Sequence, residues 1–410
     1  MAVTKPQAQL RGERVRSTKH LRLAQTFFAG VALVVLAARS LPPHSYTKDL
    51  QVEYLTAWAL REGIDVFTPL TDLSARYFPF ATTNFPHANP HPPVLTLLSV
   101  PLTLLPFPVL VPLWLALNVA LLVVVGRWLG LSTHASLALA AWPPLWWTLY
   151  IGQFELVILA LAMLGWRAAA AGREWRAGAW LGLAAVVKFY PALLVLPFVV
   201  RRQLRVPVAA GLVFAVGQAG GLIAVGPSGL VRYYRDVLPE VAGHWARYGL
   251  NSSPHGALLR LFGGAADVEP LIEAPGLVLP ATVALSALAL VALAVLRPEA
   301  SPVALLVALP NAWGYYAVLA LPQIVALTRR PELRVPALLA TAAASFVLPL
   351  VNLALGPILA VTHGTGGRAP AIAGLLAALQ ATGYLVLLLL SLMLLAAERT
   401  SGRASPHARG

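Results

Sequence analysis

The stretch LVPLWLALNVALLVVVGRWL, residues 110–129, is apolar almost throughout and carries one charged residue, Arg127, near its end. A helix needs about 20 such residues to cross the hydrocarbon core of a bilayer. Similar runs recur along the 410-residue chain, which is 58% hydrophobic and only 11% charged. Soluble domains are about one quarter charged, so this composition excludes an ordinary globular enzyme. Because the runs are continuous rather than alternating, they predict an all-α polytopic membrane protein and not a barrel.

The charges that remain lie mostly between the apolar runs. The formal net charge is +14, but Lys and Arg gather at the ends of runs that face one side, as the positive-inside rule describes. No nucleic-acid partner is therefore expected. Residues 1–20 and 398–410 are predicted cytoplasmic tails, and the run Leu23–Leu41 is expected to be a retained anchor. The chain has no cysteine, which excludes disulfides and thiolate chemistry.

The whole chain, residues 1–410, is predicted to form one integral membrane domain of about twelve segments with two large outer loops. The first loop, residues 42–93, is expected to contain an amphipathic helix over Thr47–Glu62 that lies on the membrane. Val94–Pro106 is apolar but too short to cross, so an interfacial or re-entrant segment is expected. The second loop covers residues 226–276. A continuous-span alternative stays open for residues 93–200.

Two apolar runs are interrupted by polar residues at their centres. Ala177–Val200 contains Lys188-Phe189-Tyr190-Pro191, and Val303–Leu327 contains the sequence NAWGYY, residues 311–316. Basic residues flank both runs, so each is expected to be a hairpin of two half-helices. Broken helices at membrane depth occur where they are buried or line a cavity.

Asp49 is the first carboxylate beyond the first apolar run. We interpret it as a general base at the water–lipid interface that activates an acceptor hydroxyl for attack on an anomeric carbon. A phosphate leaving group needs no protonation, so one carboxylate is sufficient. The alternative is that Asp49 merely complements a helix dipole in the first turn of a helix. Glu53 lies one turn further on and either assists or is solvated; solvation is the favoured interpretation.

Lys188 is the most specific irregularity, because a lysine inside an apolar run is costly and by default functional. It is a candidate for holding a lipid phosphate, with snorkelling to an interface as the alternative. Gln153 and Glu155 either line the same cavity or belong to a solvated loop. The arginines of the second loop are phosphate candidates, although each alone is more typical of a surface charge; the candidates are Arg232, Arg235 and Arg260.

The chain lacks the motifs of soluble nucleotide chemistry. It contains no phosphate loop, no dinucleotide fingerprint and no Asp-x-Asp metal motif. His44, His87, His91 and His255 do not have metal-site spacing, and hydrogen bonding within loops is the preferred interpretation. We therefore expect no metal and no cofactor, which fits a lipid-linked donor.

The order of these features resembles glycosyltransferase family 87, the polyprenyl-phosphate-mannose-dependent mannosyltransferases of the C-type glycosyltransferase fold. The resemblance spans nearly the whole chain and rests on Asp49, residues 54–63 (YLTAWALREG), His91-Pro92-Pro93, residues 152–155 (GQFE), residues 182–191 (GLAAVVKFYP), residues 251–253 (NSS) with Arg260, and residues 313–316 (WGYY). Two positions depart from the family pattern. Glu155 stands where Asn is common, and Tyr315 stands where His often follows Trp-Gly, so mannose is a family default here.

The resemblance implies an inverting transfer of a hexose from a polyprenyl-phosphate donor to a lipid or glycan acceptor. It places a multi-pass enzyme in a bacterial inner membrane, among membrane lipids, with its active site on the periplasmic or extracellular side. The family's catalytic aspartate corresponds to Asp49, and its lysine–proline segment to Lys188 and Pro191. We expect Tyr190 beside Lys188 at the donor phosphate and lipid. The expected substrate pocket comprises Glu53, Tyr54, His91, Gln153, Glu155, Asn251, Tyr315 and Tyr316.

A transporter or flippase of a lipid-linked sugar is the alternative function, because broken helices near the midplane also suit transporters. Against it, the sequence shows no convincing internal repeat, and long asymmetric outer loops favour a cavity that opens on one face. A structural subunit of an envelope complex is a third possibility.

Overall fold

The fold is known from a computed structural model, which describes residues 7–40, 48–77, 86–247, 251–263, 269–345 and 372–403. These residues form helices and connecting segments, with no strand among them. The first part of the chain forms α1 (Gln7–Ser40), α2 (Lys48–Arg61), α3 (Leu70–Tyr77), α4 (Pro93–Ser99), η1 (Val100–Leu104), α5 (Phe107–Trp128), α6 (Thr133–Ala138) and η2 (Leu139–Ala141). The middle part forms α7 (Pro143–Ile151), α8 (Glu155–Ala170), α9 (Glu174–Val187), η3 (Tyr190–Val195), α10 (Leu196–Val200), α11 (Arg205–Arg232), η4 (Tyr233–Val237) and α12 (Leu238–Ala246).

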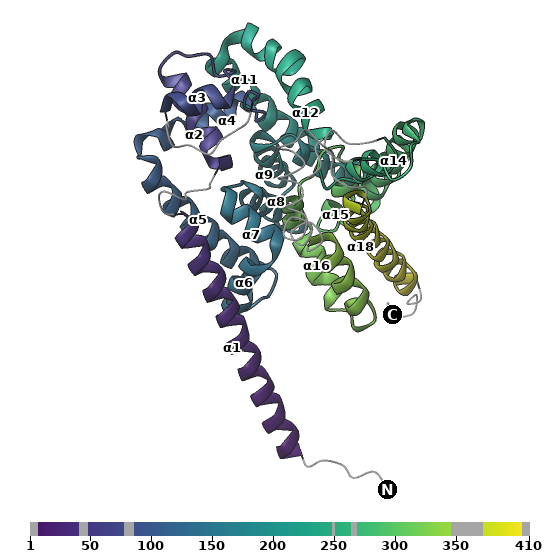
Figure 1. Ribbon diagram of the computed structural model, residues 1–410. Helices are drawn as coiled ribbons and strands as arrows, with labels where there is room; N and C mark the ends of the chain where they lie inside the picture. Colours follow the sequence, from purple (N-terminus) through teal and green to yellow (C-terminus); the bar gives the residue numbers. More distant parts are fainter. Residues whose placement is uncertain are drawn as a thin grey trace.

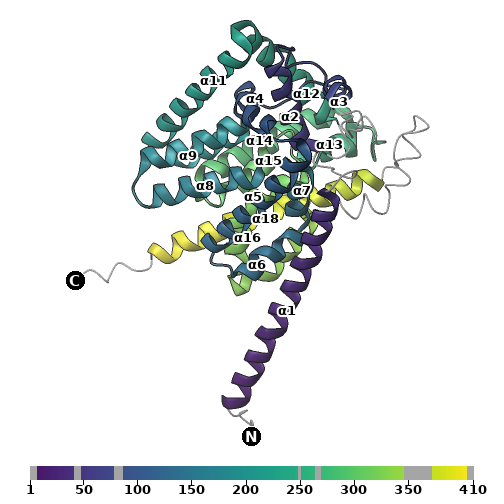
Figure 2. The same ribbon diagram turned by 90° about the vertical axis from the view of Figure 1, so that its left-hand side faces the viewer.

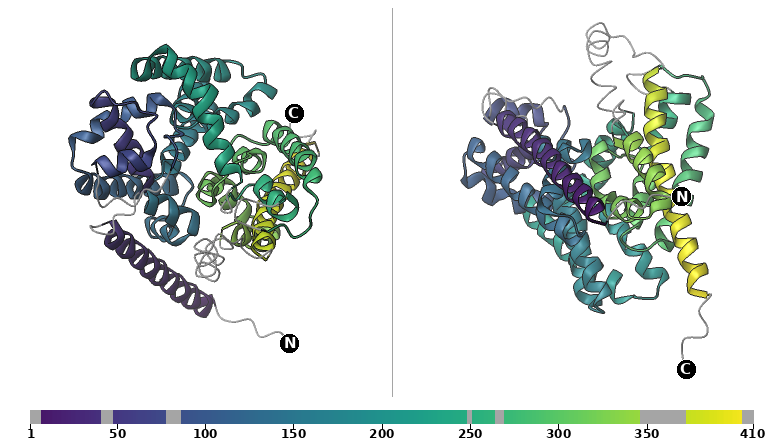
Figure 3. Two further views of the ribbon diagram at one scale, coloured as in Figure 1. Left: turned by 45° about the horizontal axis from the view of Figure 1, so that its top comes forward. Right: turned by 90° about the horizontal axis from the view of Figure 1, so that it is seen from below.

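The last part begins with two short helices and then adds longer apolar ones. It forms α13 (Pro254–Leu258), η5 (Leu259–Gly263), η6 (Pro275–Leu277), α14 (Val278–Val295), α15 (Ser301–Ala308), η7 (Gly314–Ala320), α16 (Leu321–Thr328), a helix over residues 331–345, and α18 (Ile372–Arg403). The helices α2–α4 lie at one end of the molecule beside α11 and α12, and α1 projects from the other end (Figure 1). The group α14–α18 lies on the opposite side from α2–α5 (Figure 3).

Among the described residues, four helices are long and apolar enough to cross a membrane by length and composition; they are Phe107–Trp128, Arg205–Ala246, Pro275–Val295 and Ala378–Arg399. The pair α7 and α8 would add a fifth if it is taken as one span, and these two helices are bent by 114°. Large apolar side chains are exposed along these helices, for example Leu113 and Leu117 on α5 and Val283 on α14. Such apolar surfaces are expected where lipid replaces water. The described residues are thus those of an all-helical, multi-pass membrane protein.

Both runs that were expected to be broken are interrupted. Helix α9 ends at Val187, and the chain is extended at Lys188 before η3 begins. The second run is divided into α15 and η7 with α16, and residues 309–313 between them are not helical. Kinking also occurs in α11, where Gly226 has a left-handed φ of 68° directly before Pro227. This kink lies at residue 226, where the predicted second outer loop begins.

The prediction of an amphipathic helix lying on the membrane is wrong for α2. Every residue from Leu50 to Ala57 is buried, so the helix has no solvated face. The helix packs against α3, α4, η1 and α5. Its polar residues are satisfied inside the protein; Thr56, for example, donates to the Val52 carbonyl at 2.9 Å.

Helices α9 and α11 pack at very short range through glycines, and they lie side by side (Figure 2). A Cβ on Gly178 would lie 2.2 Å from the Val206 carbonyl oxygen, and one on Gly182 would lie 2.7 Å from the Ala210 carbonyl oxygen. The two glycines are four residues apart, the spacing that lets membrane helices approach closely. This contact supports α9 just before it ends at Lys188.

Gly178→Ala is therefore expected to lower stability by about 1–3 kcal/mol, the usual range for overpacking. Gly211→Ala on α11 is the control, because a Cβ there meets nothing within 4 Å and alanine favours a helix over glycine. Thermal unfolding of the purified protein in detergent measures both. Equal midpoints for Gly178→Ala and the wild type would contradict this packing.

Candidate active site

Four elements distant in the sequence meet around the side chain of Gln153. The Asp49 carboxylate at the start of α2 accepts a hydrogen bond from Gln153 Nε2 through its Oδ2. Gln153 Nε2 also donates to the Tyr315 hydroxyl in η7 at 3.0 Å. From the break after α9, Lys188 Nζ donates to Gln153 Oε1 at 2.7 Å. Two predicted pocket residues, Gln153 and Tyr315, are thus brought into one hydrogen-bonded network with the predicted phosphate ligand Lys188 and the predicted base.

The turn that carries Gln153 is built by Gly152. This glycine ends α7 in the left-handed conformation, with φ 77° and ψ 35°, which residues with a side chain rarely adopt. The backbone N–H of Gln153 then donates to the Thr148 carbonyl at 2.9 Å. Helix α8 begins two residues later at Glu155, bent by 114° from α7. Gln153 and Glu155 therefore lie together at the inside of a sharp bend.

Lys188 and Glu155 form an ion pair that is almost completely removed from solvent. Lys188 Nζ lies 2.6 Å from Glu155 Oε1, and the side chains are 5% and 0% exposed. The alternatives of a snorkelling lysine and a solvated Glu155 are therefore wrong. Burying either charge alone would be very costly, so each is held by the other.

This pair fixes the orientation of the Gln153 amide. Its Oε1 faces the ammonium of Lys188, so its Nε2 must face Asp49 and Tyr315. The carboxylate of Asp49 is held in turn by a neutral donor rather than by a cation. A neutral partner adds no compensating positive charge, and no described residue donates to the second oxygen, Oδ1.

Aromatic rings surround the ammonium of Lys188. It lies 5.7 Å from the ring centre of Tyr315 and 5.2 Å from that of Tyr316, within the range of cation–π attraction. The rings of Tyr190 and Tyr316 are 4.8 Å apart, and the Tyr190 hydroxyl donates to Glu155 Oε1 at 3.4 Å. The predicted residues Tyr190, Tyr315 and Tyr316 thus form one wall of the network.

Asp49 is the most accessible of the three carboxylates in this region. Its side chain is only partly buried, whereas Glu53 and Glu155 are both 0% exposed. A base must reach the proton that it removes. Accessibility therefore distinguishes Asp49 from its two acidic neighbours.

Glu53 belongs to a second buried cluster, one helical turn from Asp49. Its Oε1 contacts His91 Nδ1 and accepts from Asn89 Nδ2, the latter at 3.2 Å. Asn89 also donates to the Thr56 hydroxyl at 3.1 Å. The favoured interpretation that Glu53 is solvated is wrong, because the loop before α4 covers it. The same contacts hold that loop, including the predicted residue His91, against α2.

Tyr54, Asn251 and Arg260 have packing roles around the network. The Tyr54 hydroxyl donates to the Leu105 carbonyl at 2.8 Å, and its ring lies 5.2 Å from that of Phe107. Asn251 Nδ2 donates to the Pro310 carbonyl at 3.0 Å, and Arg260 donates to the Asn251 carbonyl at 2.7 Å. Arg260 is only 2% exposed, so the alternative of a surface charge is wrong for it. Asn251 and Arg260 thereby hold the segment before η7, which carries Tyr315.

Arg232 and Arg235 lie at the protein surface beyond the kink of α11. Arg232 pairs with Asp65 at 2.6 Å, and both side chains are 49% exposed. Arg235 pairs with its neighbour Asp236 at 2.8 Å and is 74% exposed. The charge of each arginine is therefore balanced by an exposed carboxylate outside the Gln153 network.

Sequence reasoning did not single out Asn89 or the contact between His87 and Trp245. His87 Nδ1 lies 2.7 Å from the Ala88 carbonyl, and Trp245 Nε1 donates to His87 Nε2 at 3.0 Å. These partners require the neutral ring with its proton on Nδ1. The contact joins the segment before α4 to α12 and confirms that this histidine serves hydrogen bonding. Residues 87 and 245 are far apart in the sequence, so only the folded structure shows this contact.

This contact makes stability depend on pH. Burial lowers the pKa of His87 in the folded state, whereas the unfolded chain takes up the proton near its ordinary value of about 6.5. The stabilisation is fully present above that value, and it decreases as the pH falls toward the folded-state pKa. Burial lowers the pKa of His255 as well, with the same sign.

We therefore expect the temperature of the unfolding midpoint to be lower at pH 5.5 than at pH 7.5. We expect His87→Gln to reduce this fall. His134→Gln replaces an exposed histidine and should leave it unchanged. Thermal unfolding at the two pH values measures the difference. An undiminished fall in His87→Gln would show that this histidine does not titrate with unfolding.

Comparison with known proteins points to one family. The model of glycosyltransferase family 87 matches residues 90–322, a region that includes Gln153, Glu155, Lys188 and Tyr315. Two curated relatives are polyprenol-phosphate-mannose-dependent alpha-(1-2)-phosphatidylinositol pentamannoside mannosyltransferases. The one from Mycobacterium tuberculosis (strain CDC 1551 / Oshkosh) is 29% identical over 210 residues, 47% of this chain and 47% of the relative. The one from Mycolicibacterium smegmatis (strain ATCC 700084 / mc(2)155) is 33% identical over 204 residues, 47% of this chain and 48% of the relative.

The matched part thus spans about half the length of each of these two relatives. No solved structure matches the chain significantly. The family model covers more than half of the 410 residues, and its matched region contains three of the four residues of the hydrogen-bonded network. The chain belongs to glycosyltransferase family 87.

Proposed function

We propose that this protein is an inverting glycosyltransferase that moves a hexose, by analogy mannose, from a polyprenyl-phosphate carrier to a lipid or glycan acceptor. The observation that carries the proposal is the accessible Asp49 carboxylate held by Gln153, which is itself oriented by the buried Lys188–Glu155 pair. The family and the printed activity of the relatives supply the donor class. A phosphatidylinositol mannoside is the first acceptor to test.

In this mechanism, the Asp49 carboxylate takes the proton of the acceptor hydroxyl. The acceptor oxygen then forms a bond to the anomeric carbon as the bond from that carbon to the phosphate oxygen breaks. Polyprenyl phosphate leaves with the electron pair and needs no proton, because a phosphate is a stable anion. A single displacement of this kind inverts the anomeric centre.

Buried polar atoms near Asp49 suit a sugar. Glu155 Oε2 is buried and accepts no hydrogen bond from the described residues, so a sugar hydroxyl would satisfy it. Lys188 donates two hydrogen bonds to the residues around it, and an ammonium has three hydrogens. The third is available to a phosphate oxygen of the donor.

A hollow on the outer half of α11 suits the isoprenoid chain. It is lined by Leu222, Pro227, Leu230, Val231, Tyr234 and Arg235 and has a volume of about 500 Å³. The ring of Tyr234 lies 5.8 Å from that of Phe189, the residue after Lys188. We propose that the carrier lies in this hollow with its phosphate toward Lys188, and that the phosphate takes the place of Asp236 and Asp65 at Arg235 and Arg232.

The remaining proposals concern the membrane. We propose the C-type glycosyltransferase fold with about twelve segments and a periplasmic or extracellular active site in a bacterial inner membrane. The basic residues at the ends of the apolar runs support this orientation. No resident metal or cofactor is part of the proposed reaction.

The test is to incubate the purified protein in vesicles with polyprenyl-phosphate mannose and phosphatidylinositol mannoside. An enzyme releases polyprenyl phosphate in a one-to-one ratio with the mannosylated acceptor. A transporter moves the intact donor to the other leaflet and releases no polyprenyl phosphate. Donor movement without release would overturn the proposed function in favour of transport.

A further inference from the structure

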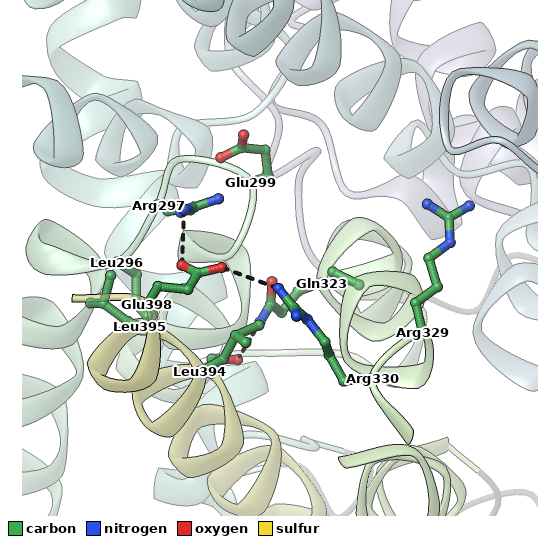
Figure 4. Close-up of a pocket in the computed structure, with 11 residues that line it drawn as sticks. Leu296, Arg297, Glu299, Gln323, Arg329, Arg330, Leu394, Leu395 and Glu398 are labelled. Carbon is green, nitrogen blue, oxygen red and sulfur yellow. Dashed lines mark hydrogen bonds and ion pairs between the residues drawn. The ribbon is translucent and has the colours of Figure 1, made fainter. Parts of the chain in front are cut away.

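A cavity of about 310 Å³ lies between the start of α15, the end of α16 and the end of α18, away from Asp49. Figure 4 shows the carboxylate of Glu398 between the guanidinium groups of Arg297 and Arg330. The sequence positions explain its location. The candidate spans Pro275–Val295 and Ala378–Arg399 both end beside it, so it lies at the level where a bilayer has its headgroups.

The charges at the cavity are mainly positive. Arg297, Arg329 and Arg330 line it together with Glu299 and Glu398, a formal excess of one positive charge. Glu398 bridges two of the arginines, at 2.9 Å from Arg297 and 3.8 Å from Arg330. These arginines keep 61% and 51% of their side-chain surface exposed, so their remaining N–H groups face outward.

Two further arginines increase the positive charge behind the cavity. Arg201 donates to the Leu296 carbonyl at 2.9 Å, at the end of α14. The pKa of Arg201 is lowered, chiefly by burial. Glu299 acts in the opposite direction, whereas the nearby charges of Arg399 and Arg297 lower this pKa further. The guanidinium groups are therefore close enough to repel one another, which favours an anion between them.

The rest of the lining is apolar or neutral. Leu296, Leu394 and Leu395 form a wall. At the floor, Gln323 is 5% exposed and donates to Ser391 at 3.1 Å. A free phosphate ion would make no use of a leucine wall, whereas a phospholipid has a phosphate joined to acyl chains. Basic cavities between membrane helices on the cytoplasmic side are suited to such headgroups.

We propose that this cavity binds the phosphate headgroup of an anionic phospholipid of the cytoplasmic leaflet, with Arg297 and Arg330 as the main phosphate ligands. The headgroup competes with Glu398 for the two guanidiniums. The site lies beside both ends of the α15–η7–α16 segment, and Tyr315 lies near the middle of the same segment. A lipid here would therefore hold the segment that carries part of the candidate active site.

The test measures lipid binding rather than transfer. The full-length protein in a neutral detergent is titrated with phosphatidylglycerol, with phosphatidylcholine or with inorganic phosphate, and the unfolding midpoint is recorded. Phosphatidylglycerol should raise the midpoint, and the other two should not. Equal stabilisation by phosphatidylcholine would overturn the charge recognition, and stabilisation by inorganic phosphate alone would overturn the lipid as the source.

Matched variants place the effect at the cavity. Each arginine near an anionic lipid contributes roughly a fivefold gain in affinity, so Arg297→Gln/Arg330→Gln should weaken the response about 25-fold. Arg76→Gln removes an exposed arginine that also pairs with a glutamate, Glu62, at 3.3 Å, and should leave the response unchanged. Glu398→Gln removes the competing carboxylate and should strengthen it. An unchanged response in both cavity variants would overturn the site.

Discussion

Asp49→Asn is expected to lower the rate of sugar transfer by about 10²–10⁴-fold, the usual contribution of a general base. The replacement has nearly the same shape, and its amide oxygen still accepts a hydrogen bond from Gln153 Nε2. The network should therefore persist while the proton acceptor is lost. Initial rates of polyprenyl-phosphate release, measured at saturating donor and acceptor, give the comparison.

The control is Asp72→Asn, which removes an exposed carboxylate in α3 and should leave the rate unchanged. Both variants should unfold at the wild-type temperature. If Asp49→Asn retained more than about one tenth of the wild-type rate, a loss far below that of a general base, the assignment of the base would be wrong. Loss of activity with a lowered unfolding midpoint would instead indicate a structural role.

Lys188→Met is expected to lower stability by about 3–5 kcal/mol, because it leaves the charge of Glu155 buried without its partner. Replacing both partners removes the uncompensated charge, so Lys188→Met/Glu155→Met should regain most of that stability. Apolar replacements of a buried ion pair are often neutral or stabilising. Thermal unfolding of the two single variants and the double variant measures the coupling.

The double variant also separates stability from activity. Without the ammonium, Gln153 Oε1 loses its donor, so the amide that holds Asp49 is no longer oriented. We expect the double variant to fold but to stay nearly inactive. If the single and double variants were equally unstable, the pair would not be coupled. If the double variant were fully active, the orientation of Gln153 would not matter.

Several features of the site followed from local sequence patterns. Lys188 interrupts an apolar run directly before an aromatic–proline pair, and a break in the helix was predictable from that interruption alone. The polar turn at residues 152–155 was visible for the same reason. The position of Asp49 after the first apolar run also made it a candidate without any knowledge of contacts.

The burial of Glu53 and Glu155 could not be predicted in this way. Each carboxylate is satisfied by residues more than 30 positions away, Glu53 by Asn89 and Glu155 by Lys188. A sequence pattern shows the cost of burying a charge but not the distant partner that offsets it. The all-round burial of α2 was missed for the same reason, since its polar residues find partners within the protein.

The broken runs make the number of membrane segments hard to predict from hydropathy alone. Four helices of the described part of the chain meet the length and composition expected of a span, while the broken runs around Lys188 and residues 309–313 give shorter pieces. A hydropathy pattern counts apolar residues but does not distinguish a crossing from a hairpin of half-helices. Residues 346–371, where further apolar sequence occurs, lie outside the described residues.

The most direct test is the anomeric configuration of the transferred sugar relative to the donor, read from the one-bond C–H coupling in the product's NMR spectrum. One carboxylate acting as base in a single displacement predicts inversion. Retention would require a covalent glycosyl–enzyme intermediate and a carboxylate nucleophile. That result would contradict the role assigned to Asp49.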